Sequence, residues 1–102
     1  MFANIQVRVL VACGTSIATA TVAANKVNEI AEEAGLKVSV SQCKAIEIRG
    51  KIETFNPHLI VAMTPTPSDL GVPVFNGIPF LSGVGMDQLK QDILEAMQAA
   101  IE

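Results

Sequence analysis

The sequence predicts an α/β fold in which a four-stranded, parallel, doubly wound sheet is flanked by helices. Short runs rich in β-branched residues alternate with longer segments in which apolar residues recur every three or four positions. The first run is apolar almost throughout its second half, which is typical of a strand buried on both faces. Strands that alternate with helices imply crossover connections and therefore a parallel sheet.

The first strand and helix are the clearest elements. Ile5 to Ala12 predicts a buried strand, and a helix is expected from about Ile17. Its apolar face would consist of Ala20, Ala23, Val27, Ile30, Ala31 and Ala34. Gly35 follows this pattern directly, where a helix most often needs a residue in the left-handed conformation. The helix should therefore end just before Gly35.

The later elements are shorter. Leu36 to Gln42 alternates between apolar and polar residues and predicts the second strand, closed by Cys43. The expected elements that follow are a short helix at Ala45–Phe55, a strand at His58–Met63, a loop at Thr64–Gly71, a strand at Val72–Phe75 and an irregular segment at Asn76–Gly85. Asp87 is a candidate N-cap for a last helix. The apolar face of that helix would be Leu89, Ile93, Met97 and Ile101.

Length and composition exclude several classes of function. The 102 residues suit one domain, half of them are hydrophobic, and the net charge is −3. Nucleic-acid binding is disfavoured because it depends on clustered lysine and arginine. The most apolar stretch, Val7 to Ala24, is interrupted by polar residues and does not suit a membrane span. The start of the chain also lacks the basic region of a secretory signal, so we expect a cytoplasmic protein.

The two cysteines do not indicate a metal site or a structural disulfide. Cys13 and Cys43 are far apart in the sequence, and the single histidine, His58, adds no zinc-binding spacing. A disulfide is disfavoured in a reducing compartment. No metal and no other cofactor is expected, so each cysteine has to be judged by its local sequence.

Cys13 stands where chemistry is expected in such a fold. Ligands of open α/β sheets bind beyond the carboxyl ends of the strands. There the chain reads Cys13, Gly14, Thr15, Ser16, Ile17, Ala18 and Thr19. The start of a helix offers unpaired N–H groups that bind anions, and a glycine lets the backbone curl around such a group. These donors would favour a thiolate at Cys13 and would also hold a phosphoryl group, although a small buried cysteine would fit the same pattern.

The other candidate residues have simpler interpretations. Cys43 follows a strand without a glycine turn or hydroxyl residues, and His58 stands at the beginning of a strand, so both are expected to be structural. Asp69 lies in the loop after the third strand, where it is either a turn residue or a general acid. The three glutamates at 29, 32 and 33 predict the solvated face of the first helix.

These residues resemble a known family. The chain is similar, from about Gln6 to Ala100, to the enzyme IIB components of the bacterial phosphoenolpyruvate-dependent sugar phosphotransferase system, especially the galactitol-specific group. The most specific segment is VLVACGTSIATATVAANKV at 9–27. Two weaker segments are SQCKAIEI at 41–48 and GIPFLSGVGMDQL at 77–89, and the spaced glycines of the last one indicate the galactitol group.

The resemblance implies a phosphocarrier. A histidine-phosphorylated enzyme IIA would donate a phosphoryl group to Cys13, and the group would pass to a sugar alcohol held by the membrane permease, enzyme IIC. The phosphate-binding loop would be Gly14, Thr15, Ser16, Ile17, Ala18 and Thr19, mainly through backbone N–H groups. The family fold is a four-stranded parallel sheet flanked by helices, similar to that of the low-molecular-weight tyrosine phosphatases. Residues 1–102 would then be one IIB domain, associated with the membrane only through enzyme IIC.

Three other classes stay open at this point. A low-molecular-weight phosphatase needs an arginine six positions after its cysteine, and this chain has Thr19 there. A thiol reductase would need Cys43 as a resolving cysteine within disulfide reach of Cys13. A non-catalytic interaction domain would keep its function when Cys13 is replaced by serine.

Overall fold

The computed structural model describes residues 6–14, 17–67 and 69–101; within these, the side chains of residues 17–20 and 101 are not described. The sheet has four parallel strands in the order β2-β1-β3-β4. Their bounds are Val7–Cys13 for β1, Val38–Lys44 for β2, Leu59–Ala62 for β3 and Val74–Asn76 for β4. The predicted four-stranded parallel sheet is therefore confirmed.

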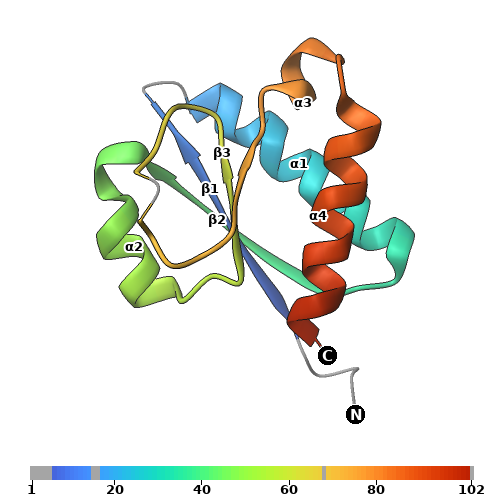
Figure 1. Cartoon of the computed structure of the whole chain (residues 1–102), viewed down its shortest axis with the longest axis horizontal. Helices are drawn as coiled ribbons and strands as arrows, with labels where there is room; N and C mark the ends of the chain where they lie inside the picture. The colour runs from blue at the N-terminus through green and yellow to red at the C-terminus, as the bar shows by residue number, and fades with distance from the viewer. Residues whose placement is uncertain (1–5, 15–16, 68, 102) are drawn as a thin grey trace.

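Helices cover both faces of this sheet. They are α1 (Ile17–Ala34), the 3₁₀ turn η2 (Ala45–Glu47), α2 (Ile48–Phe55), α3 (Pro79–Ser82) and α4 (Met86–Ile101). Figure 1 shows α1 and α4 on one side of the sheet and α2 on the other, as in a doubly wound fold. In the part of the chain that the structure describes, no helix has both the length and the apolar character that a membrane crossing requires.

The central strands divide the core into two layers. Residues 9–12 of β1 and 59–61 of β3 are fully buried because each strand has a neighbour on both sides and helices over both faces. The odd-numbered positions of β1, from Val7 to Cys13, pack with α1 and α4. Leu10 and Ala12 instead pack with Cys43 and Ile48, on the α2 face. The alternation of a strand thus assigns each side chain to one layer.

The strand order creates a switch point between β1 and β3. From β1 the chain crosses through α1 to β2 on one side, and from β2 it crosses through α2 to β3 on the other side of β1. In open α/β sheets, ligands bind in the crevice outside the carboxyl ends of the strands at such a switch point, here between β1 and β3. Cys13 is the last residue of β1 and therefore lies at this crevice.

The C-terminus of α1 confirms the role predicted for Gly35. Gly35 has φ +72° and donates its N–H to Glu32 O at 3.1 Å, while Leu36 N–H reaches Ala31 O at 2.9 Å. This pair of bonds is the Schellman motif, which needs a left-handed residue at the position of Gly35. Ala34, however, is exposed and does not belong to the apolar face.

Several predicted boundaries were wrong. Cys43 lies inside β2 rather than after it, because the pairing with β1 continues to Lys44. The segment predicted to be irregular contains α3, and just before this helix the side chain of Asn76 accepts a hydrogen bond from Ile78 N at 3.0 Å. Asp87 lies within the first turn of α4 rather than at its N-cap, and there its charge suits the helix dipole. Ile5 lies outside the described residues.

Gly77 connects β4 to α3 and packs directly on β3. Its N–H donates to Ala62 O at 2.8 Å. A Cβ at this position would lie 2.7 Å from Val61 Cγ1 and closer still to Met63 Sδ. Both neighbours are buried, so they have little room to move.

We expect Gly77→Ala to lower the free energy of unfolding by about 1–3 kcal/mol, the usual effect of overpacking. Urea denaturation would measure it. Gly50→Ala is the matched control, because Gly50 lies in α2 with nothing within 4 Å of an added Cβ. That substitution should stabilise the chain by roughly 0.5–1 kcal/mol through helix propensity. Equal stability of Gly77→Ala and the unaltered chain would contradict the tight packing.

Candidate functional site

Cys13 ends the central strand with its side chain on the α1 face. The residue is 4% exposed, and its Sγ donates a hydrogen bond to Cys43 O at 3.6 Å. The sulfur therefore lies beside the last peptide units of β2. This arrangement gives a covered thiol at the carboxyl edge of the sheet, on the last residue of β1.

Thr64 lies directly beside Gly14, the residue that follows Cys13. A Cβ built on Gly14 would stand 3.5 Å from Thr64 Oγ1 and 3.7 Å from Thr64 Cβ, so the backbone after Cys13 and the hydroxyl after β3 are neighbours. The hydrogen bond from Met63 N to Ala12 O, 2.7 Å long, fixes this approach. The sequence predicts Thr64 only as the first residue of a loop. The adjacency of β1 and β3, which sequence alone did not reveal, brings it to the site.

The predicted phosphate-binding loop is described in part. Thr15 and Ser16 lie outside the described residues, whereas the backbone of Ile17, Ala18 and Thr19 forms the start of α1. The first N–H groups of a helix have no partner within the helix. Three residues separate Cys13 from the start of α1, as predicted. Binding of an anion by the N–H groups of this helix start stays a prediction. Gly14 has no positive φ, so the backbone does not require a glycine there.

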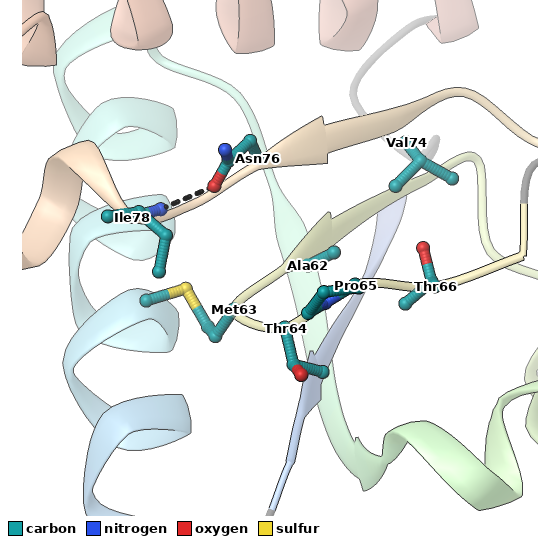
Figure 2. A pocket seen from close by; sticks show the side chains of 8 residues that line it. All are labelled: Ala62, Met63, Thr64, Pro65, Thr66, Val74, Asn76 and Ile78. Carbon is teal, nitrogen blue, oxygen red and sulfur yellow. Dashed lines mark hydrogen bonds between the residues drawn. The ribbon is translucent and has the colours of Figure 1, made fainter.

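A pocket of about 400 Å³ opens next to this site, at the carboxyl ends of β3 and β4. Figure 2 shows its lining, which comprises Ala62, Met63, Thr64, Pro65, Thr66, Val74, Asn76 and Ile78. The side-chain oxygen of Asn76 is turned to Ile78 N, as the dashed line marks. Thr64 lines this pocket and also lies beside Gly14, so the pocket adjoins the backbone that follows Cys13.

Cys43 is separated from Cys13 by the sheet itself. The register pairs Cys43 with Ala12 and Lys44 with Cys13, so the two cysteine side chains leave opposite faces. Burial and the nearby Glu47 carboxylate raise the pKa of the Cys43 thiol. Cysteines whose Cβ vectors diverge cannot form a disulfide without backbone movement. This geometry opposes the thiol-reductase alternative, and Cys43 is structural, as predicted.

The side chains of Asp69 and His58 bond to residues other than Cys13. Asp69 Oδ1 accepts a hydrogen bond from Arg49 Nη2 at 2.8 Å, and this bond and the arginine charge hold the pKa of Asp69 below its usual value. An ionised carboxylate is poorly suited to be the general acid of a phosphatase. His58 Nδ1 accepts from Arg8 N at 2.9 Å at the amino end of β3, the structural role that the sequence predicts. Burial lowers the pKa of His58, and the charge of Arg8 acts in the same direction.

Comparison with known proteins agrees with this architecture. The family model for the lactose/cellobiose-specific IIB subunit of the phosphotransferase system matches residues 8–99. The galactitol-specific EIIB component of Escherichia coli K12 is 33% identical over 92 residues, which are 89% of this chain and 96% of that protein. SgcB of the same strain, provisionally named as a phosphotransferase enzyme IIB component, is 40% identical over 86 residues, which are 84% of this chain and 91% of SgcB.

A solved structure shows the same fold. The lactose-specific IIB domain of Streptococcus pneumoniae superposes with a TM-score of 0.56 at 19% identity, covering 95% of this chain and 96% of that one. The four-stranded parallel sheet flanked by helices is thus the fold of a phosphotransferase-system IIB domain. The chain belongs to the IIB family of the phosphoenolpyruvate-dependent sugar phosphotransferase system.

Proposed function

We propose that this chain is a phosphocarrier that accepts a phosphoryl group on Cys13 Sγ from a histidine of enzyme IIA and passes it to a sugar alcohol held by enzyme IIC. The observation that carries the proposal is the position of Cys13. It is the last residue of the central strand, it stands at the switch point of the sheet, and three residues separate it from the start of α1. Because the chain belongs to the IIB family, we assign phosphoryl transfer to the carboxyl edge of the sheet, where Cys13 lies.

Two displacements at phosphorus complete the transfer. In the first, Cys13 Sγ attacks the phosphorus atom of the phosphohistidine, the P–S bond forms, and the P–N bond breaks. The thiol proton goes, in net terms, to the departing imidazole. In the second, a hydroxyl oxygen of the sugar alcohol attacks, the P–S bond breaks, and the sulfur regains a proton. Such transfers depend mainly on positioning and on charge stabilisation.

The site supplies positioning without a hydrolytic apparatus. Backbone N–H groups at the start of α1 and the hydroxyl of Thr64, which lies beside Gly14, would hold the phosphoryl group carried on Cys13. To react, the Cys13 side chain must turn away from the carbonyl of Cys43, to which it is hydrogen-bonded. The ionised Asp69 and the absence of an arginine at position 19 both disfavour a phosphatase.

The carboxyl edge also offers contact area for partner proteins. Ile46 is 91% exposed in η2, directly after β2, and Ile78 and Leu81 are exposed after β4. Exposed apolar side chains around a site are typical of interaction surfaces. We assign this edge to the docking of IIA and IIC in turn, at the cytoplasmic side of the membrane. Galactitol or a related polyol is the proposed acceptor, because galactitol-specific EIIB components are among the relatives.

Incubation with phosphoenolpyruvate, the general phosphotransferase proteins and a galactitol-type IIA should add one phosphoryl group to the chain, as measured by intact mass. Cys13→Ser should lack the added mass, and Cys43→Ser should keep it because Cys43 lies on the other face of the sheet. A phosphoryl group that persists in Cys13→Ser would refute the assignment.

A pair of substitutions at Gly14 tests the crevice. Gly14→Ala should transfer at close to the normal rate, since its Cβ would make ordinary contact with Thr64 at 3.5 Å. Gly14→Val places further methyl groups in the crevice and should slow transfer by at least about tenfold. Rapid-quench measurement of single-turnover transfer from phosphorylated IIA would compare the two. Equal rates for alanine and valine would show that the phosphoryl group does not occupy this crevice.

A further inference from the structure

The carboxyl edge of β2 carries a lysine in direct register with Cys13. The Cα atoms of Lys44 and Cys13 are partners in the β1–β2 ladder, and neighbouring strands are about 4.8 Å apart. Lys44 has extended backbone angles, φ −80° and ψ 152°, so the alternation of β2 still holds at this residue. Its side chain therefore leaves the same face of the sheet as Cys13, the face that α1 covers.

The sulfur of Cys13 is turned in the same direction. Its hydrogen bond to Cys43 O places Sγ beside the Cys43–Lys44 peptide. A phosphoryl group on this sulfur would extend from the covered thiol to the solvent at the carboxyl edge. Lys44 is exposed there, and its four-carbon stem can bring the ammonium group to that position.

Lys44 stands apart from the other basic residues of the chain. Two of them lie at the amino edge of the sheet, where Arg8 donates to Asn56 O and Lys37 precedes β2. Three others form ion pairs: Lys26 with Glu29, Arg49 with Asp69, and Lys90 with Glu33. Lys51 lies near Cys43, where its charge offsets a small part of the rise in the Cys43 pKa, and so belongs to the α2 face. No ion pair is recorded for Lys44 within residues 6–14, 17–67 and 69–101.

We infer that Lys44 is a phosphoryl-binding residue, whose ammonium group pairs with the phosphoryl oxygens while the group is carried on Cys13. The inference rests on the proposed function. A lysine binds phosphate as a mobile point charge, in contrast to the fixed two-pronged grip of an arginine. It can therefore hold the group and still release it to an acceptor. The positive charge of Lys44 also offsets the negative charge of the nearby Glu47 carboxylate, whose Oε1 accepts a hydrogen bond from Lys44 N at 3.1 Å.

The test compares Lys44→Met, Lys44→Arg and Lys37→Met with the unaltered chain. Lys37→Met removes the same charge beside the same strand, but at the opposite edge of the sheet. We expect Lys44→Met to slow single-turnover transfer from IIA about fivefold to tenfold, as the loss of a charge-assisted contact should. Lys44→Arg should recover most of the rate, and Lys37→Met should keep it.

Phosphorus NMR of the phosphorylated chain gives a second readout that a merely structural lysine would not change. The second ionisation of a phosphate ester has a pKa of about 6, and a neighbouring cation lowers it. In Lys44→Met this ionisation should move to higher pH, and in Lys37→Met it should not move.

The outcomes separate the two claims. If the unaltered chain accepts phosphate on Cys13, but Lys44→Met transfers and ionises as the unaltered chain does, the role of Lys44 is refuted and the carrier function stands. If the unaltered chain accepts no phosphoryl group from phosphorylated IIA, both are refuted.

Discussion

The in-register pairing of β1 with β2 on one side and β3 on the other is the constraint on which the site depends. It buries residues 9–12 of β1 completely and brings the ends of three strands to one edge. Cys13, Lys44 and Thr64 come from three separate parts of the sequence, yet the two ladders make them neighbours. A slip of one residue in the β1–β2 pairing would turn the side chains of β2 to opposite faces and remove Lys44 from the side of Cys13.

The same alternation gives the two cysteines different roles. Cys13 ends a strand on the α1 face, at the crevice, whereas Cys43 packs with Leu10 and Ile48 beneath α2. The sulfur of Cys13 nevertheless reaches the carbonyl of Cys43 across the ladder, because that carbonyl lies in the plane of the sheet. The backbone of Cys43 thus holds the resting thiol, while its own thiol belongs to the core. A redox pair would need both sulfurs on one face.

Much of this arrangement could be predicted from the sequence. The buried β1, the α1 helix that ends at Gly35 and the position of Cys13 before a helix start follow from local patterns, and the structure agrees with them. The proximity of Thr64 and Lys44 to Cys13 could not be predicted, because it depends on strand order and register. The α3 turn was missed because Gly77, Pro79 and Gly83 suggest irregular structure, whereas the Asn76 side chain and the packing of Gly77 on β3 stabilise a helical turn.

Amide NMR spectra of the free and the phosphorylated chain would test most directly that the phosphoryl group sits at the carboxyl edge between β2, β1 and β3. We expect the largest shift changes at Cys13, Gly14, Lys44 and Thr64, with smaller changes along the first turn of α1. Changes concentrated instead in α2 around Ile48, or at the amino edge around His58, would contradict the account.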